Sequence, residues 1–139
     1  MESALLYGAE IWTLTKSLKK QLDGCCTRML RVALNVSWKS HTMNTNLYQE
    51  LPKVTLKIQQ RRMRLAGHCI RHTVKIIANK LVLWQLMEGR TSRRRRKIMY
   101  VDVLLENTGM ERVQELSTIM EDCEDWRKCV DPVVGHLDR

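Results

Sequence analysis

The chain has 139 residues, of which 44% are hydrophobic and 28% charged, and this fits one globular domain with a buried core. Its net charge of +9 is unevenly spread: residues 1–100 carry 20 Lys and Arg against 5 Asp and Glu, and residues 101–139 carry 4 against 10. No membrane-spanning apolar segment and no signal peptide is evident. We therefore expect an intracellular protein, in nucleus or cytoplasm, with reduced cysteines and a polyanionic partner for its basic part. A merely solvated basic surface remains the alternative.

The first part of the chain predicts one uncertain element and one clear helix. Residues 4–12 are apolar around a glycine, which suits either a strand or the first turn of a helix. Thr13 and Thr15 then offer N-cap oxygens for an amphipathic helix over residues 16–35, which Asn35 ends. The apolar stripe of this helix repeats at spacings of 4, 3, 4 and 3, at Leu18, Leu22, Cys25, Met29 and Val32.

Residues 53–72 form the strongest predicted helix. Its apolar positions fill one arc, which Gly67 interrupts and into which Arg62 also falls. The helical periodicity does not explain Arg62. It leaves two alternatives: the residue faces a second packing surface, or its side chain extends past its apolar neighbours to solvent. The apolar set consists of Leu56, Ile58, Met63, Leu65, Ala66, Cys69 and Ile70.

The remaining segments complete a mainly α fold. Residues 73–88 are β-branched and apolar, and residues 81–84 could form a short strand pair with the N-terminal segment. We expect a first helical region over residues 1–88, in which helices 16–35 and 54–71 pack through their apolar stripes. A basic linker over residues 89–97 and a smaller C-terminal helical subdomain over residues 98–139 follow.

A row of basic side chains lies opposite the apolar arc of the 53–72 helix. Its members are spaced by 4, 3, 4 and 3 residues and include no acid, so the row gains no pairing along the helix and repels itself. Such a row suits the phosphates of a nucleic acid, and an ordinary solvated face is the alternative. The members are Lys57, Arg61, Arg64, His68 and Arg71.

A second basic cluster lies in the predicted linker. Its five consecutive cations suit phosphates and also resemble a nuclear import sequence, whereas a flexible solvated linker is an equal alternative. The cluster is Arg93, Arg94, Arg95, Arg96 and Lys97.

Metal and aromatic chemistry are weakly indicated. His68 and His72 have the i, i+4 spacing that can share a metal, but no Cys-x-x-Cys and no second close pair accompany them. We therefore expect packing cysteines, no metal and no cofactor, with a zinc module as a third interpretation. The tryptophans are expected in the core with bonded N–H groups, and base stacking is the alternative.

No catalytic motif is recognisable in the chain. It has no glycine-rich phosphate loop, no HExxH and no nucleophile elbow. Asp102 is a single acid where two-metal phosphoryl transfer needs a pair. We expect a protein that is not an enzyme and has no small-molecule substrate.

Six short segments, which together extend over nearly the whole chain, form a recognisable series. They are residues 5–15 (LLYGAEIWTLT), 28–31 (RMLR), 62–72 (RMRLAGHCIRH), 80–84 (KLVLW), 100–102 (YVD) and 108–109 (TG). In this order they resemble the region that follows the polymerase domain in RTE-type non-LTR retrotransposons, whose proteins are endonuclease-reverse transcriptases. The resemblance implies that residues 1–88 are thumb-like.

The resemblance implies a thumb and C-terminal extension that grip template RNA or a primer duplex. In that family the endonuclease and the catalytic aspartates precede this region, so no catalytic residue is carried over. RNA or DNA, contacted through the backbone, is then the expected partner, and a complete reverse transcriptase acting in trans is a further one.

The linker departs from the family pattern, which has Gly where Arg94 stands and Pro where Arg96 stands. Because Gly and Pro fix special backbone angles, the turn is expected to be lost while charge is gained. This departure favours the alternative hypothesis of an inactive orphan fragment from a decayed mobile element.

Overall fold

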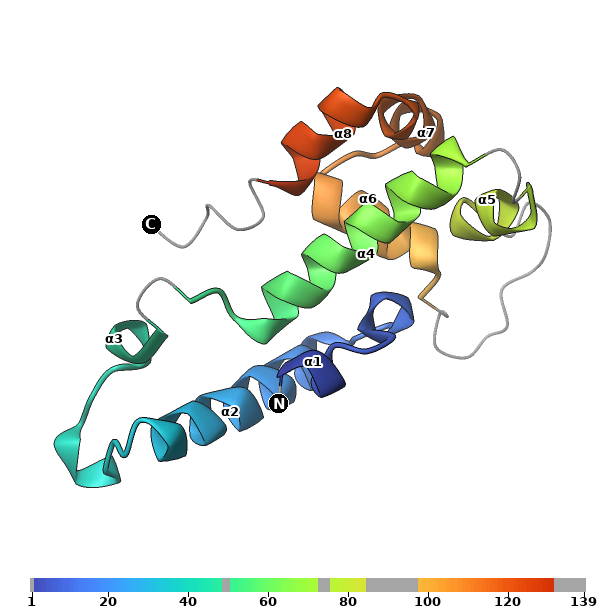
Figure 1. Cartoon of the computed structure of the whole chain (residues 1–139). Coiled ribbons are helices and arrows are strands. Elements are labelled where there is room, and N and C mark those ends of the chain that lie inside the picture. Colours follow the sequence, from blue (N-terminus) through green and yellow to red (C-terminus); the bar gives the residue numbers. More distant parts are fainter. Residues whose placement is uncertain (1, 49–50, 73–75, 85–97, 132–139) are drawn as a thin grey trace.

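The computed structural model describes residues 2–48, 51–72, 76–84 and 98–131 (Figure 1). All regular elements in these ranges are helical, which confirms the predicted mainly α fold. None of the described helices has the length and apolar character needed to cross a bilayer. The elements are α1 (Glu2–Leu5), the 3-10 turn η1 (Ala9–Ile11), α2 (Lys16–Ala33), the 3-10 turn η2 (Trp38–Ser40), α3 (Asn44–Tyr48), α4 (Val54–Arg71), α5 (Ile76–Val82), α6 (Tyr100–Thr108), α7 (Val113–Glu121) and α8 (Cys123–Val130).

The short strand pair predicted near residues 4–12 and 81–84 does not form. Helix α1 and turn η1 occupy the first segment, and Gly8 separates them with a φ of 67°. Most of the second segment lies in or directly after α5, where the Nδ2 of Asn79 donates to the carbonyl of Ile70 at 3.3 Å. A lone strand pair is marginal in water, so packing of these apolar segments against α4 outweighs their β propensity.

Helix α2 begins and ends close to its predicted bounds. The Oγ1 of Thr15 accepts a hydrogen bond from the backbone N–H of Leu18 at 3.3 Å, which is the predicted N-cap. Asn35 takes a left-handed φ of 53° just beyond the helix, as expected of a C-terminal stop. None of the residues of α2 is fully buried, although Leu22 and Cys26 pack against α4.

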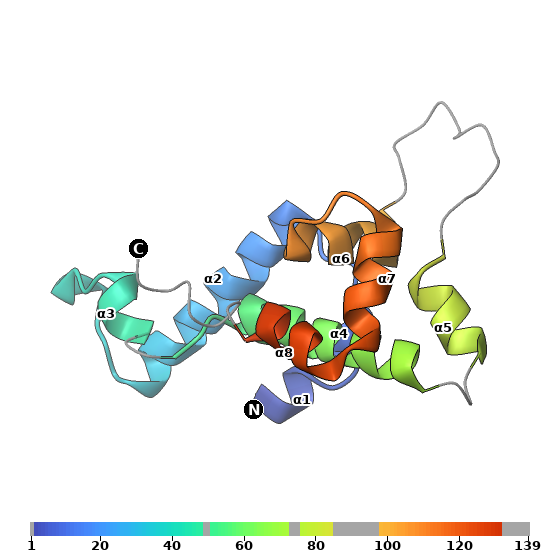
Figure 2. The ribbon, with the colours of Figure 1, turned by 90° about the horizontal axis from the view of Figure 1, so that it is seen from above.

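Helix α4 is the central element, with α2 and the N-terminal segment along one side and α6, α7 and α8 along another (Figures 1 and 2). One apolar cluster joins it to the N-terminal segment through Leu6, Ala9, Val54 and Ile58. The larger cluster joins it to the C-terminal helices through Met63, Ala66, Ile70, Val101, Leu104, Leu116, Met120, Trp126 and Val130. The predicted packing of the two long helices is confirmed only around Leu22 and Cys26 of α2.

The first turn of α4 is capped from another helix. Its own N-cap residue, Lys53, makes no side-chain capping bond. Instead the carboxylate of Asp23 in α2 accepts from the backbone N–H of Thr55 at 3.3 Å and from the Thr55 hydroxyl at 2.8 Å. A carboxylate at a helix N-terminus also interacts favourably with the helix dipole. Asp23 therefore fixes where α2 crosses the start of α4.

Arg62 is buried in the middle of α4, with 2% of its surface exposed. Its Nε donates to the carbonyl of Glu10 at 3.3 Å, and its Nη2 donates to the carbonyl of Trp12. Burial lowers the pKa of the Arg62 guanidinium. The position that periodicity left unexplained thus ties the N-terminal segment to α4.

The C-terminal helices share their core with α4. Helices α7 and α8 follow one another with Asp122 between them. Trp126 is 2% exposed, and its Nε1 donates to the carbonyl of Met63 at 2.9 Å. The hydroxyl of Tyr100 donates to the neighbouring carbonyl of Arg62 at 3.3 Å, and burial raises the pKa of Tyr100 to about 12.

Candidate nucleic-acid interface

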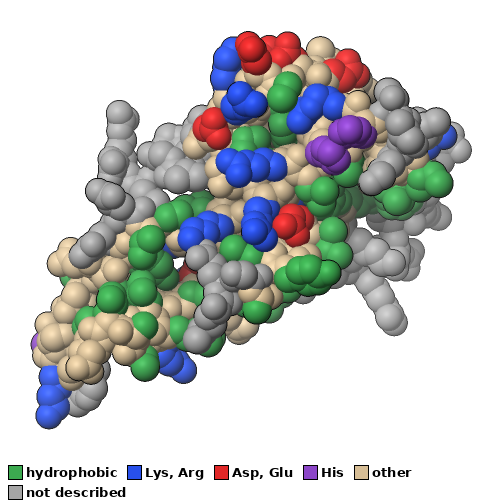
Figure 3. Space-filling model, viewed as in Figure 1, with side chains coloured by type: hydrophobic (Ala, Val, Ile, Leu, Met, Phe, Trp, Pro, Cys, Tyr) green, Lys and Arg blue, Asp and Glu red, His purple; other side chains and the backbone are tan. Residues whose placement is uncertain are grey.

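The predicted basic row lies on the face of α4 that the two apolar clusters leave uncovered. Arg61, Arg64 and His68 are exposed, while Lys57 and Arg71 are half-buried at its two ends. We call these five residues the α4 row. Figure 3 shows Lys and Arg side chains across this side of the molecule, with histidine beside them and some carboxylates among them. The structure therefore brings the row together but does not leave it free of acids.

Arg61 is held by the N-terminal segment. Its Nη1 donates to the carbonyl of Leu6 at 2.9 Å and lies 3.4 Å from Oε1 of Glu10, with 45% of the arginine side chain still exposed. An exposed ion pair of this kind contributes little to stability, but it offsets part of the positive charge of the row. The sequence pattern missed it because Glu10 lies 51 positions away.

Arg71 is held by the C-terminal helices. Its Nη1 donates to the carbonyl of Met120, the penultimate residue of α7, at 2.9 Å. This bond leaves the remaining donors of the guanidinium directed toward α8. Arg71 is thus positioned before any ligand arrives.

Arg64 differs from its neighbours in the row. Within the described ranges its guanidinium makes no hydrogen bond or ion pair with protein, although it is exposed in the middle of α4. It lies one turn after Arg61 and two turns before Arg71. Arg64 is therefore the member of the row that is free to contact a ligand without disturbing the fold.

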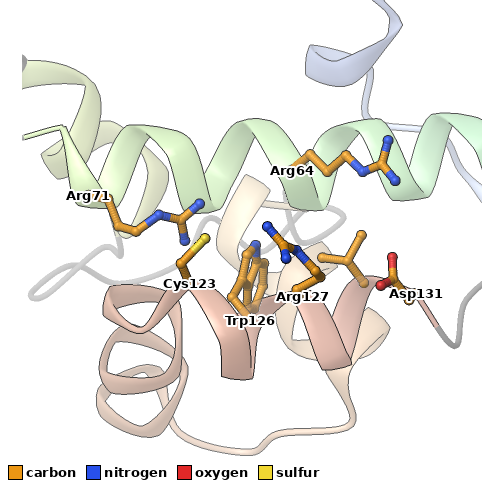
Figure 4. A pocket seen from close by; sticks show the side chains of 7 residues that line it. Arg64, Arg71, Cys123, Trp126, Arg127 and Asp131 are labelled. Atoms are coloured by element: carbon orange, nitrogen blue, oxygen red, sulfur yellow. The ribbon is translucent and has the colours of Figure 1, made fainter.

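A hollow of about 460 Å³ lies between α4 and α8, and we call it the α4–α8 hollow. In Figure 4, Arg71 reaches from α4 toward Cys123, Arg127 reaches from α8 toward α4, and Arg64 extends along α4 on the side where Asp131 lies. Its lining consists of Arg64, Arg71, Cys123, Trp126, Arg127, Val130 and Asp131. Among the described residues, three arginines and one carboxylate thus line the same cavity.

Arg127 and Trp126 were not among the predicted site residues. The four lining residues on α8 before Asp131 are spaced as i, i+3, i+4 and i+7, which is the pattern of one helix face. This spacing could have indicated that Arg127 shares a face with Trp126. The acid-rich sequence around them concealed it, because the overall charge of residues 101–139 is negative.

Two acids near the start of α8 interact within that helix. The backbone N–H groups of Asp125 and Glu124 donate to the Asp122 side chain and hold the pKa of that carboxyl below its usual value. Asp125 pairs with Lys128 at 2.7 Å, and this raises the pKa of the lysine. Two of the acids are therefore engaged in capping or pairing within α8 itself.

Of the remaining predicted features, the histidine pair and the cysteines belong to the described residues and the linker cations do not. His68 and His72 lie with their ring centroids 4.1 Å apart, but no group of three metal-ligating side chains occurs in the described ranges. None of the five cysteines forms a disulfide. Arg93, Arg94, Arg95, Arg96 and Lys97 lie outside the described residues.

The tryptophans behave differently from one another. Trp126 is buried with its N–H bonded, as predicted for a core tryptophan, whereas Trp12 and Trp84 are exposed. The contact of Trp12 with α4 involves its backbone, because its carbonyl accepts a hydrogen bond from the guanidinium of Arg62.

Comparison of the chain with protein-family models, with curated proteins and with solved structures finds no match.

Proposed function

We propose that this chain is a non-catalytic segment that binds the backbone of RNA or DNA through the α4 row. It would correspond to the thumb and C-terminal extension that follow the polymerase in RTE-type retrotransposon reverse transcriptases. The observation that carries the proposal is the exposed, unpaired Arg64 between Arg61 and Arg71 on a helix that contains no acid. An exposed arginine without a protein partner gains free energy when it contacts a phosphate backbone and releases that backbone's counterions.

The three arginines of the α4 row contribute to the proposed binding in different ways. Arg64 contacts phosphate directly, whereas Arg61 and Arg71 also hold the carbonyls of Leu6 and Met120. Replacement of all three arginines would therefore disturb the fold as well as the charge. The linker cations at residues 93–97 add to the proposed binding surface by charge alone. Such a protein would act inside the cell, in nucleus or cytoplasm, alone or beside a complete reverse transcriptase.

Filter binding across a salt series tests this proposal, with single-stranded RNA and duplex DNA measured in parallel. We expect affinity to fall steeply with salt for both ligands, because phosphate contacts are independent of sequence. Arg64→Gln should weaken both and reduce the salt slope by about one. The exposed Arg28 of α2 offers a matched control, Arg28→Gln, which should change little. A flat salt response of the wild-type protein would disprove the proposal.

A second candidate is an inactive orphan fragment without biochemical activity. It is favoured by the apolar surface around the N-terminal segment, where Tyr7 is 88% and Ile11 70% exposed. Apolar side chains that gather on a surface commonly mark a face that another protein covers. Thermal unfolding followed by circular dichroism separates the candidates, because a self-sufficient binding protein unfolds in one cooperative step. A broad, non-cooperative transition favours the orphan fragment.

A further inference from the structure

The α4–α8 hollow has an excess of positive charge that the protein does not neutralise. Of the residues that the structure describes, Arg64, Arg71 and Arg127 line it, with Asp131 as the single acid. In the described part of the chain none of these arginines forms an ion pair with Asp131, and Arg64 and Arg127 make no side-chain hydrogen bond. Positive charges that line one cavity repel each other, and an anion in the cavity would relieve this repulsion.

We infer that the α4–α8 hollow binds one phosphate group of the RNA or DNA strand that the α4 row contacts. This inference rests on the proposed function and adds Arg127 of α8 to the interface. Arg71 is fixed by its 2.9 Å bond to the Met120 carbonyl and provides a rigid anchor. Arg127 reaches toward α4 and Arg64 extends along α4, so a rotation of the Arg64 side chain would bring both onto the phosphate from the two helices. A planar guanidinium can donate two parallel hydrogen bonds to phosphate oxygens, which a lysine ammonium cannot do.

The lining favours a phosphate over a nucleobase. Although Trp126 forms part of the wall, it is 2% exposed, so its indole presents no free face on which a base could stack. Its N–H is already bonded to the Met63 carbonyl and cannot read a base edge. The donors that remain are the arginines, which carry positive charge and recognise anions.

The position of the hollow favours an anion that belongs to a strand. Arg64 lies at its edge, and the α4 row continues from there to Arg61 and Lys57. With a rise of 1.5 Å per residue, Lys57 lies about 10 Å along the helix axis from Arg64. A ligand with regularly spaced phosphates can therefore fill the hollow and contact the row together.

Fluorescence anisotropy with short single-stranded RNA tests the contribution of Arg127. We expect Arg127→Gln to weaken binding about tenfold and to lower the salt slope by about one. Arg112→Gln is the matched control, since Arg112 is an exposed arginine of the same region outside the hollow and should change affinity less than twofold. The affinity of Arg127→Lys should be intermediate, because lysine keeps the positive charge but cannot donate two parallel hydrogen bonds to a phosphate. Circular dichroism verifies that each variant folds as the wild-type protein does.

Alkylation of cysteines, quantified peptide by peptide, tests the location. Cys123 lines the hollow, whereas the equally exposed Cys25 on α2 lies outside it. We expect the RNA, and inorganic phosphate at higher concentration, to slow alkylation of Cys123 and not of Cys25. A strand with a 5′-phosphate that protects Cys123 better than its 5′-hydroxyl form identifies a strand end as the ligand, and equal protection identifies an internal phosphodiester.

The outcomes separate the two proposals. If the wild-type protein binds RNA but Arg127→Gln behaves as Arg112→Gln does, or if Cys123 is not protected, the hollow is not a phosphate site and the function of the α4 row stands. If the wild-type protein does not bind RNA, the proposed function fails. Protection of Cys123 by inorganic phosphate alone then decides whether the hollow binds phosphate.

Discussion

A Cβ atom on Gly67 would overlap Cδ1 and Nε1 of the Trp126 indole, so the tryptophan packs where only glycine leaves room. The same indole nitrogen donates to the carbonyl of Met63, one turn earlier in α4. Gly67 therefore serves neither a turn nor an unusual backbone angle. It allows α8 to approach α4 closely enough for Trp126 to be buried between them.

Gly67→Ala should destabilise the protein by about 1–3 kcal/mol, because the new methyl group overpacks a buried and hydrogen-bonded indole. Arg71, whose Nη1 would lie 3.0 Å from the new Cβ, restricts relaxation on the other side. Urea denaturation measures the change. The matched control is Gly24→Ala in α2, because a Cβ atom there would have no neighbouring atom within 4 Å. This substitution should stabilise the protein by up to about 1 kcal/mol, because alanine has the higher helix propensity. Equal effects at the two positions would show that Gly67 makes no close contact.

Arg62→Met should destabilise the protein by about 2 kcal/mol, since it leaves the carbonyls of Glu10 and Trp12 without their donors. Detachment of the N-terminal segment should also make residues 1–15 more susceptible to limited proteolysis. Denaturation and protease digestion followed by mass spectrometry measure both effects. Arg28→Met, at an exposed position of α2, should leave both unchanged. A methionine that packs at position 62 without loss would argue against an anchoring role.

Asp23→Ala should destabilise the protein by about 1 kcal/mol, the usual effect of removing a helix cap. The loss falls on the start of α4, although the substitution lies in α2, because the cap acts between helices. A double-mutant cycle with Thr55→Ala separates the hydroxyl bond from the backbone bond. Additive effects of the two substitutions would rule out the side-chain contact as a source of stability.

Acid should weaken α8 through Asp122. The backbone bonds from Asp125 and Glu124 lower the pKa of Asp122 from its ordinary value, so the ionised carboxylate contributes stability at any pH above that ordinary value. The contribution is lost as pH falls through the lower pKa of the folded state. Asp122→Asn keeps a capping oxygen that does not ionise, and its melting temperature should therefore fall less between pH 5 and pH 2 than that of the wild-type protein. Identical falls would mean that Asp122 titrates alike in folded and unfolded chains.

Local patterns predicted the helices, because apolar spacing and capping residues act within a few positions. Thr15 and Asn35 bound α2 as expected, and the exposed cations of α4 lie on the predicted face. Arg62 and Gly67 could not be explained in this way, because their partners Trp12 and Trp126 lie 50 and 59 positions away. The pairing of Arg61 with Glu10 likewise depends on contact between the N-terminal segment and α4. This pairing reduces the number of cations in the α4 row that are available to a ligand.

The candidate site was only partly predictable for a related reason. Two of the arginines that line the α4–α8 hollow, Arg64 and Arg71, lie on α4 and follow from periodicity, whereas Arg127 belongs to a segment whose net charge is negative. Only the crossing of α8 over α4 places Arg127 beside Arg64 and Arg71. Charge averaged over a segment therefore conceals a cation that tertiary structure brings into a basic surface.

Because the C-terminal helices cover α4, the core around α4 can form only at the end of synthesis. The larger apolar face of α4, at Met63, Ala66 and Ile70, has its covering residues in α6–α8. A growing chain leaves the ribosome N-terminus first, so α4 emerges well before Trp126 does. Until the last helix follows, this face remains uncovered in the nascent chain. We therefore expect ribosome-bound chains that end before α8 to recruit chaperones, and those that extend beyond Val130 to release them.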